Sequence, residues 1–216
     1  SIIIDDIGYR LKEGRAMIKL SPELTYAILP NAPYTKQLAA LAHQHGKEVM
    51  LHLPMQATSN DKPELGALSV DMNQKEVVDM MQKAFANVPQ AVGMNNHQGS
   101  LLTRHPGHMA WVMKEMRKKG QFFVDSRTSK QSIADKIAIE NFLDHDINKA
   151  SIEAQFNRLI KLAKRKGYAI GIGHPHPETL AVLQKVLPKL QQLNVQLVPV
   201  SHQLNNNQWL LTKRRD

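Results

Sequence analysis

The chain opens with Ser1-Ile2-Ile3-Ile4-Asp5-Asp6-Ile7-Gly8, an apolar run that leads directly into two acids. Three consecutive β-branched residues favour a buried strand over a helix, because their side chains are restricted at χ1. A buried strand that ends in adjacent carboxylates brings negative charge to one rim of a sheet, where a cation or hydrogen-bond donors must compensate it. Asp5 and Asp6 are therefore candidates for a metal or acid–base site. The alternative is that they cap the following turn or helix.

Further strand-like apolar runs alternate with helical periodicity almost to the end of the 216-residue chain. Several of these runs are continuously apolar, as expected of strands buried on both faces of a parallel sheet. We expect strands at residues 2–4, 25–29, 48–53, 91–94, 121–124, 141–143, 168–172 and 195–200. Between them we expect helices at residues 33–45, 73–88, 106–119, 149–166 and 177–193.

This alternation predicts an α/β fold, an irregular (β/α) barrel with seven or eight mostly parallel strands. An open doubly wound sheet is the alternative. The length suits one hydrophobic core, and no linker, low-complexity stretch or internal repeat divides the chain. We therefore expect a single domain over residues 1–216.

The composition limits the classes of partner and site. The chain has no cysteine, which leaves histidine, aspartate and glutamate as metal ligands. Its formal net charge is +9, but the basic residues lie mostly on amphipathic helices and only 5% of residues are aromatic, so we expect no nucleic-acid partner. No apolar run reaches the roughly 18 residues of a membrane span. Residue 1 already begins a strand, so we expect no signal peptide within the chain, although a removed export signal is compatible with it.

The clearest functional signal is the position of the histidines and acids. Six of the expected strands end in His or Asp, and the carboxyl ends of parallel strands in such a fold meet at one rim. Besides Asp5 and Asp6, these residues are His52, His97, Asp125, His174 with His176, and His202.

Each of these residues also has a structural interpretation. His52 could be a buried core histidine, and Asp125 could cap a turn or pair with Arg127. If the residues do converge, one carboxylate and two imidazoles suit Zn²⁺ or a similar divalent ion. A second carboxylate could then act as general base on a water molecule.

Five motifs resemble those of the divergent polysaccharide deacetylase family. They are the opening Ile2–Gly8 stretch, His52-Leu-Pro-Met55, Asn95-Asn-His-Gln-Gly-Ser100, Val124-Asp-Ser-Arg-Thr128 and Gly171-Ile-Gly-His-Pro175. The resemblance implies an irregular barrel that uses a divalent metal, for which the imidazole and carboxylate ligands favour Zn²⁺. It also implies a hydrolase of C–N bonds other than peptide bonds, which removes acetyl groups from an amino-sugar polysaccharide or oligosaccharide. Many members are envelope proteins, which implies a periplasmic or secreted location.

The resemblance further assigns roles to individual residues. Asp5 would be the catalytic base, Asp6 a metal ligand and His174 the general acid. Better-known deacetylases place a second ligand histidine four residues after the first, but here Gln56 occupies that position after His52. We expect His97, from the next strand, to take the place of the lost ligand.

The expected site contains three kinds of residue, and the function has alternatives. The third metal ligand is His52, with His174 as the alternative, and Arg127 would orient Asp125 or stabilise an oxyanion. Because of Gln56, an inactive glycan-binding or envelope-associated protein that keeps the barrel is the second hypothesis. A metal-dependent phosphoesterase is the third, although no glycine-rich phosphate loop is present. The expected metal ligands, catalytic residues and substrate-binding residues are, in that order, Asp6, His52 and His97; Asp5, Asp125 and His174; and Asn96 and Arg127.

Overall fold

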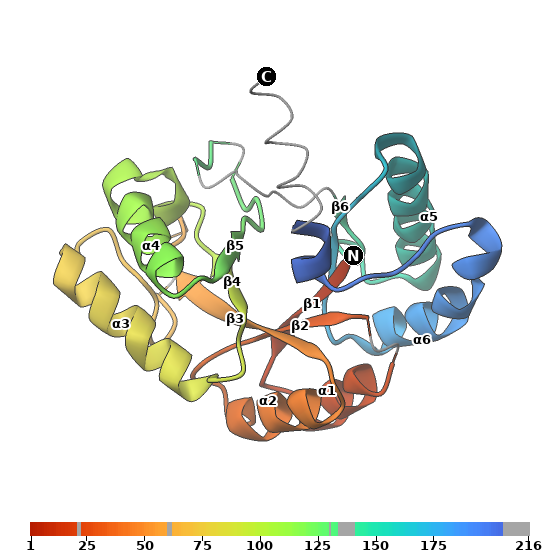
Figure 1. Cartoon of the computed structure of the whole chain (residues 1–216), viewed down its shortest axis with the longest axis horizontal. Coiled ribbons are helices and arrows are strands. Elements are labelled where there is room, and N and C mark those ends of the chain that lie inside the picture. Colours follow the sequence, from red (N-terminus) through yellow and green to blue (C-terminus); the bar gives the residue numbers. More distant parts are fainter. Residues whose placement is uncertain (21–22, 60–61, 130, 134–140, 205–216) are drawn as a thin grey trace.

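The computed structural model describes residues 1–20, 23–59, 62–129, 131–133 and 141–204. Within them, seven parallel strands form one sheet in the order β5-β4-β3-β2-β1-β7-β6. The sheet curls into an open half-barrel with the helices packed around its outer face (Figure 1). The strands are β1 (Ile2–Ile7), β2 (Thr25–Ile28), β3 (Glu48–Met55), β4 (Gly93–Gln98), β5 (Phe122–Val124), β6 (Asn141–Phe142) and β7 (Gly171–Gly173). This confirms the predicted irregular α/β barrel.

The helices follow the predicted order with one addition. They are α1 (Leu11–Ile18), α2 (Thr35–Gln44), α3 (Gln74–Asn87), α4 (Pro106–Lys118), α5 (Lys149–Lys166) and α6 (Pro177–Val186), with short 3₁₀ turns η1 (Leu102–Arg104), η2 (Leu187–Lys189) and η3 (Gln191–Leu193). Helix α1 was not predicted from the sequence, because it is short and has glycine in its middle. Its Gly14 allows close packing on α2, since a Cβ there would lie 2.8 Å from Leu38 Cδ1.

Two predictions near the carboxyl end of the chain are wrong. The predicted helix at 177–193 ends at Val186, because Pro188 lacks the N–H that would continue the α-helical hydrogen bonds, and the chain goes on in the short 3₁₀ turns η2 and η3. The predicted strand at 195–200 does not form, and residues 200–204 are helical. The first N–H groups of this helical turn are bound by other side chains: Thr25 Oγ1 accepts from Val200 N (3.1 Å) and Glu48 accepts from Ser201 N (3.2 Å).

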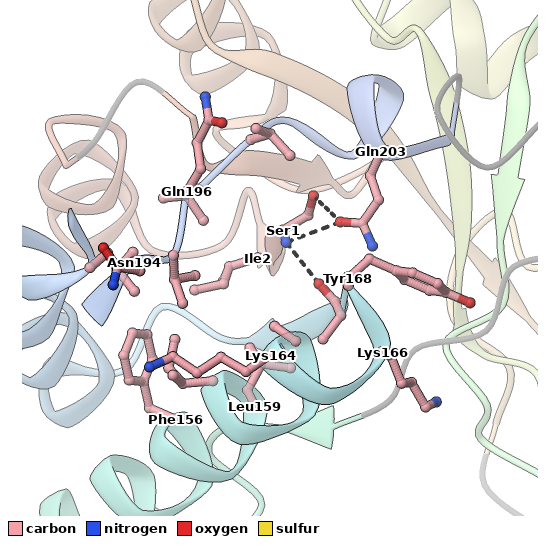
Figure 2. A pocket seen from close by; sticks show the side chains of 18 of the residues that line it. Ser1, Ile2, Phe156, Leu159, Lys164, Lys166, Tyr168, Asn194, Gln196 and Gln203 are labelled. Atoms are coloured by element: carbon pink, nitrogen blue, oxygen red, sulfur yellow. Dashed lines mark hydrogen bonds between the residues drawn. The ribbon is translucent and has the colours of Figure 1, made fainter. Parts of the chain in front are cut away.

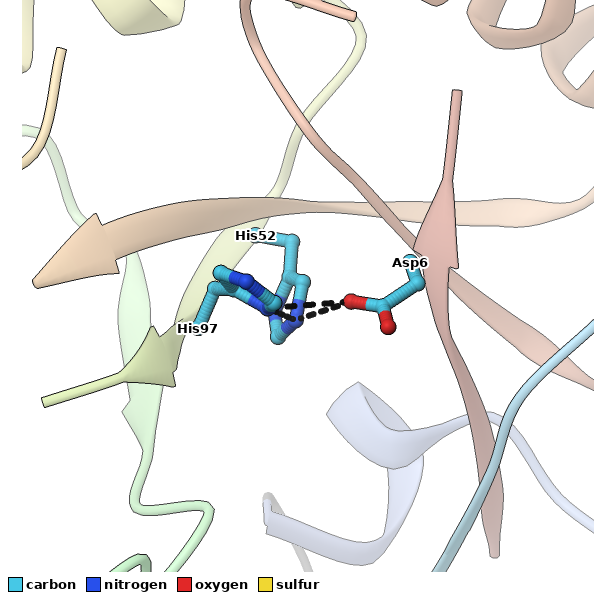
Figure 3. Close-up of side chains that lie close together, drawn as sticks. All are labelled: Asp6, His52 and His97. Carbon is cyan, nitrogen blue, oxygen red and sulfur yellow. Dashed lines mark hydrogen bonds and ion pairs between the residues drawn. The ribbon is translucent and has the colours of Figure 1, made fainter. Parts of the chain in front are cut away.

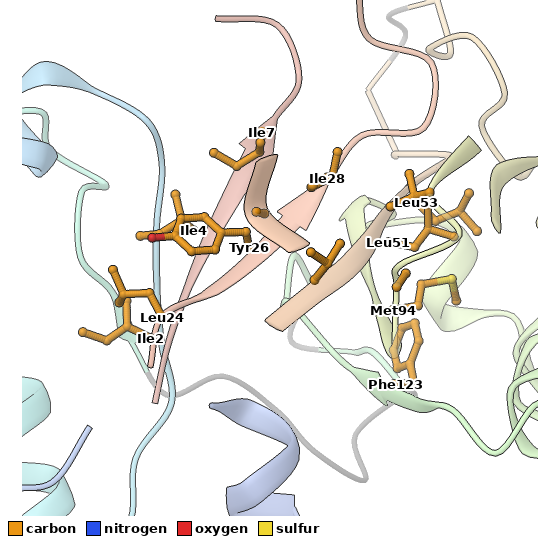
Figure 4. Close-up of a cluster of buried hydrophobic side chains, with 14 of the residues drawn as sticks. Ile2, Ile4, Ile7, Leu24, Tyr26, Ile28, Leu51, Leu53, Met94 and Phe123 are labelled. Atoms are coloured by element: carbon orange, nitrogen blue, oxygen red, sulfur yellow. The ribbon is translucent and has the colours of Figure 1, made fainter. Parts of the chain in front are cut away.

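The sheet is buried on both faces, as its continuous apolar runs predicted. Side chains of alternate residues form the large cluster under the helices, including Ile2 and Ile4 of β1 (Figure 4). Ile3 faces the opposite, concave side, where it joins a second cluster with Val200 and Leu204 of the carboxyl-terminal helical turn. By the same alternation, Asp5 belongs to the concave side.

The topology brings the carboxyl ends of the strands to one rim. Strand β3 pairs with β4 so that His52 lies opposite Asn95 and Pro54 opposite His97. Strand β1 lies in the interior of the sheet, between β2 and β7. Residues from the strands on both sides of β1 can therefore meet over its carboxyl end.

Candidate metal centre and acid–base site

Three of the predicted ligands meet at the rim. Asp6 of β1, His52 of β3 and His97 of β4 point toward one another (Figure 3). Asp6 Oδ1 lies 3.2 Å from His52 Nε2 and 3.0 Å from His97 Nδ1, and the two imidazole nitrogens are 3.1 Å apart. Ligands held about 2.0–2.1 Å from a tetrahedral Zn²⁺ would lie about 3.3–3.4 Å from one another. The triangle is therefore close to one face of a zinc coordination shell.

The outer hydrogen bonds determine which nitrogens face the centre of this triangle without a proton. Asn95 donates from Nδ2 to Asp5 Oδ1 (2.8 Å), so its Oδ1 accepts from the Nδ1–H of His52 (2.8 Å). Glu64 Oε1 likewise accepts from the Nε2–H of His97 (3.2 Å). In the neutral rings, the inward nitrogens then carry lone pairs.

Asp6 completes a set of three acceptors. Its Oδ1 is buried and has no hydrogen-bond partner of suitable geometry among the described residues. The two imidazoles and this carboxylate oxygen therefore converge on a point that a cation would satisfy, and nitrogen and oxygen ligands of this kind suit Zn²⁺. The donor set fits the expected metal.

The two adjacent aspartates lie in different electrostatic environments. Burial raises the pKa of Asp5, whose side chain is only 3% exposed and whose Oδ2 lies 3.8 Å from His52 Nε2. Burial would also raise the pKa of Asp6, but the imidazoles of His52 and His97, 3.2 and 3.0 Å from its Oδ1, outweigh that effect and lower it. Neighbouring carboxyls whose pKa values move apart are suited to different roles, one as a base and one as a ligand.

On the other side of β1, His174 is held by a buried carboxylate. Its Nδ1–H donates to Asp144 Oδ1 (2.8 Å), and Asp144 Oδ2 accepts from the backbone N–H of His174 (2.6 Å) and from Thr179 Oγ1 (2.7 Å). Burial would lower the pKa of His174, but the bond to Asp144 outweighs it and raises the pKa to about 9. His174 is therefore protonated at neutral pH and poised to act as a general acid rather than as a metal ligand.

One cavity connects the two halves of the site. It has a volume of about 350 Å³ and is lined by Asp6, Phe142, Asp144, His145, His174 and His176. Asp144, His174 and His176 also lie close enough together to form a second group of possible ligands. The oxygens of Asp144 already accept three hydrogen bonds, which favours an orienting role for this carboxylate.

The remaining predicted residues lie nearby but are used differently. Asp125 is fully buried, and its Oδ1 accepts from the backbone N–H of Arg127 (2.8 Å), so the guanidinium group of Arg127 does not make this contact. Among the described residues, no hydrogen bond or ion pair joins Asp125 to the metal triangle. The amide of Asn96 binds Ser126 N (2.9 Å) and the carbonyl of Gln98 (2.6 Å). The catalytic role of Asp125 and the substrate-binding roles of Asn96 and Arg127 stay predictions.

Sequence reasoning did not assign Asn95, Glu64 or Asp144. Asn95 stood within the quoted Asn-Asn-His motif without a role. Asp144 follows an expected strand directly, so the signal that identified Asp125 could have found it as well. Nothing local marked Glu64, because its contact with His97 spans 33 residues.

A second cavity lies away from this rim. It has a volume of about 400 Å³ and is formed by Ser1 and Ile2 at the start of β1, by α5 and by the segment around Asn194–Gln203 (Figure 2). Parallel α/β folds place their chemistry at the carboxyl ends of the strands, whereas this cavity lies at their amino ends.

Solved structures of other proteins share the fold. An uncharacterized protein, ATU2773, from Agrobacterium tumefaciens superposes with a TM-score of 0.88 at 22% identity, over 94% of this chain and 87% of that one. BA3943 of Bacillus anthracis, a CE4 family pseudoenzyme, gives a TM-score of 0.60 at 14% identity, over 94% and 63%. The catalytic domain of a peptidoglycan N-acetylglucosamine deacetylase from Eubacterium rectale gives 0.57 at 12% identity, over 92% and 86%.

Sequence comparison identifies relatives and the family. An uncharacterized protein of Haemophilus influenzae is 40% identical over 95% of this chain and 76% of its own length. The uncharacterized protein YibQ of Escherichia coli is 37% identical over 96% of this chain and 68% of its own length. The model of the divergent polysaccharide deacetylase family matches residues 2–204. The chain therefore belongs to the divergent polysaccharide deacetylase family.

Proposed function

We propose that this protein is a divalent-metal-dependent hydrolase that removes acetyl groups from an amino-sugar polysaccharide or oligosaccharide. The observation that carries the proposal is that Asp6 of the possible metal centre and His174 line the same cavity. Asp6, His52 and His97 form a cation-binding triangle beside the buried Asp5, and the protonated His174 lies on the other side.

Each group has a defined task in this reaction. A divalent ion held by Asp6, His52 and His97 would polarise the acetyl carbonyl and lower the pKa of a water molecule. Asp5 accepts a proton from the attacking water, whose oxygen forms a bond to the acyl carbon. His174 donates a proton to the amide nitrogen as the C–N bond breaks, which releases acetate and a free amine.

The proposal includes a setting and a substrate class. The acetylated glycans of bacterial envelopes lie outside the cytoplasm, so the proposed location is periplasmic or secreted. Within the described residues no helix combines the length and apolarity needed to cross a membrane. Zn²⁺ is the preferred metal on the basis of its ligand set.

Two measurements test the proposal. Metal content is determined by mass spectrometry for the wild type and for Asp6→Ala and His97→Ala, with Glu153→Ala as a surface carboxylate control. Acetate release is then measured on peptidoglycan and chitooligosaccharides with added Zn²⁺. Both ligand variants should lose stoichiometric metal, and Asp5→Asn should keep the metal but lose about 10²–10⁴-fold in rate, as expected for removal of a general base.

The outcomes also separate the second candidate function. Gln56 stands where the better-known deacetylases have a ligand, which favours an inactive glycan-binding protein that keeps the barrel. Glycan binding without acetate release in the metal-loaded protein would support that candidate. Stoichiometric metal in both ligand variants would refute the assigned metal centre.

A further inference from the structure

Gln56, which replaces the expected ligand histidine, fastens a neighbouring segment to the end of β3. Its side-chain Oε1 accepts from Val70 N (2.9 Å) and from Ser69 Oγ (3.0 Å). Its backbone N–H donates to Leu68 O (2.8 Å), and Leu68 N in turn donates to Pro54 O (2.9 Å). These four bonds hold residues 68–70 against the last residues of β3.

The same segment carries Glu64 to the metal centre. We call residues 62–72 the Glu64 segment. Besides its attachment at Gln56, it is held by Asn31, whose Nδ2 donates to Leu65 O (2.9 Å), and it turns through the bond from Ala67 N to Glu64 O (3.0 Å). Glu64, one third exposed, then reaches His97 Nε2 at 3.2 Å.

We propose that the Glu64 segment is the outer support of the metal centre, in which Gln56 anchors the segment and Glu64 orients His97. Position 56 therefore does not hold the metal itself but supports His97, the ligand from the next strand. The inference rests on the metal site of the proposed function, and it adds Glu64 and Gln56 as positioning residues.

The physical basis is the second hydrogen bond of a ligating imidazole. Such a ring normally donates its outer N–H to an acceptor, which fixes its tautomer and orientation, and loss of that acceptor typically weakens metal binding 10–100-fold. His52 has Asn95 as its acceptor, at 2.8 Å. Among the described residues, Glu64 is the acceptor for the outer nitrogen of His97.

The test measures metal affinity rather than activity. Zn²⁺ dissociation constants are obtained by competition with a chromophoric chelator for the wild type, Glu64→Ala, Glu64→Gln, Gln56→Ala and the double variant Glu64→Ala/Gln56→Ala. Glu153→Ala is the matched control, because that carboxylate is similarly exposed but binds Lys185 between α5 and α6. The absorption bands of the Co²⁺-loaded proteins report the ligand geometry directly.

Glu64→Ala should bind Zn²⁺ about 10–100-fold more weakly and shift the Co²⁺ bands. Glu64→Gln should restore most of the affinity, because its amide oxygen can still accept from His97. Gln56→Ala should weaken binding less, and the double variant should be no weaker than Glu64→Ala, since one residue acts through the other.

Three results would overturn all or part of the inference, and they can be distinguished. If the wild type and Glu153→Ala bind Zn²⁺ tightly and Glu64→Ala binds equally well, the positioning role is refuted while the metal centre stands. Additive losses in the double variant would refute the link between Gln56 and Glu64. A wild type that binds no divalent metal would refute both this inference and the proposed function.

Discussion

The bond between Asp144 and His174 can be tested by a substitution that removes one charge and little volume. In Asp144→Asn, the side-chain oxygen can still accept from Thr179 and from the backbone N–H of His174, which the carboxylate now binds at 2.7 and 2.6 Å. The amide NH₂ then faces His174 Nδ1 in place of a carboxylate oxygen. The imidazole must accept there, which favours its neutral form.

The magnitude follows from the pKa of His174. Although burial opposes it, Asp144 and the more distant Asp5 and Asp6 raise this pKa from 6.5 to about 9. At about 1.4 kcal/mol per pKa unit, the folded state gains about 3 kcal/mol from the protonated ring. This gain is fully present below pH 6.5 and is lost as the pH rises through about 9. We expect Asp144→Asn to lose most of it, about 2–3 kcal/mol at pH 6 and far less at pH 10.

Two assays check this expectation. The imidazole signals of His174 are titrated by NMR, and urea unfolding is measured at pH 6 and at pH 10. Thr179→Val is the control, because it removes one hydrogen bond to Asp144 but leaves the charge, so the pKa of His174 should stay high. If the proposed reaction takes place, the alkaline limb of the rate profile should also move to lower pH in Asp144→Asn. An unchanged titration of His174, or equal destabilisation at both pH values, would refute the reasoning.

Three further substitutions test the support of the site and the fold. Asn95→Ala removes the acceptor of His52 and should weaken Zn²⁺ binding about 10–100-fold in a chelator competition, and unchanged affinity would contradict the assigned tautomer. Gly93→Ala would place a Cβ 2.4 Å from the ring of Phe122 on the neighbouring strand, and urea unfolding should show a loss of about 1–3 kcal/mol. Asn73→Ala removes the capping box of α3 and should cost about 1 kcal/mol in the same assay, without any change in metal affinity.

The fold was predictable where one physical signal dominated. Apolar runs, several of them continuous, predicted the seven strands, since burial on both faces of a sheet leaves no polar alternation. The same rule failed at residues 195–200, because Val200 reaches the concave face from a helical turn. The apolar character of a segment predicts only that it is buried. Whether its backbone is a strand or a helix depends on which groups accept its N–H hydrogen bonds. Here Thr25 and Glu48, both distant in sequence, receive them.

The site was predictable to the extent that it follows from strand order. His52 and His97 were expected near Asp6 because parallel strands end at one rim, and the structure places them there. No comparable rule predicts from the sequence which contacts the loops make. Glu64 reaches His97 only because Gln56 and Asn31 hold its segment, and neither bond has a periodic signature in the sequence.

The adjacent acids at the end of β1 serve one site only because the strand is irregular there. In a regular strand, neighbouring side chains point to opposite faces, so Asp5 and Asp6 could not both approach His52. They do so at 3.8 and 3.2 Å, because Asp6 has a left-handed φ of +56° and the pairing of β1 with β2 shifts between Ile4 and Ile7.

Such a backbone costs a non-glycine residue on the order of 1–3 kcal/mol and persists only where the surrounding structure holds it. Four described non-glycine residues have a positive φ, and three of them, Asp6, Gln98 and Arg127, lie at or just beyond the carboxyl ends of β1, β4 and β5. Backbone strain concentrated along one rim is typical of a functional site, and the N-cap position of the following helix α1 is occupied by Arg10 rather than by either aspartate. The position of Asp6 among the described residues therefore argues against the capping role that its sequence context had left open.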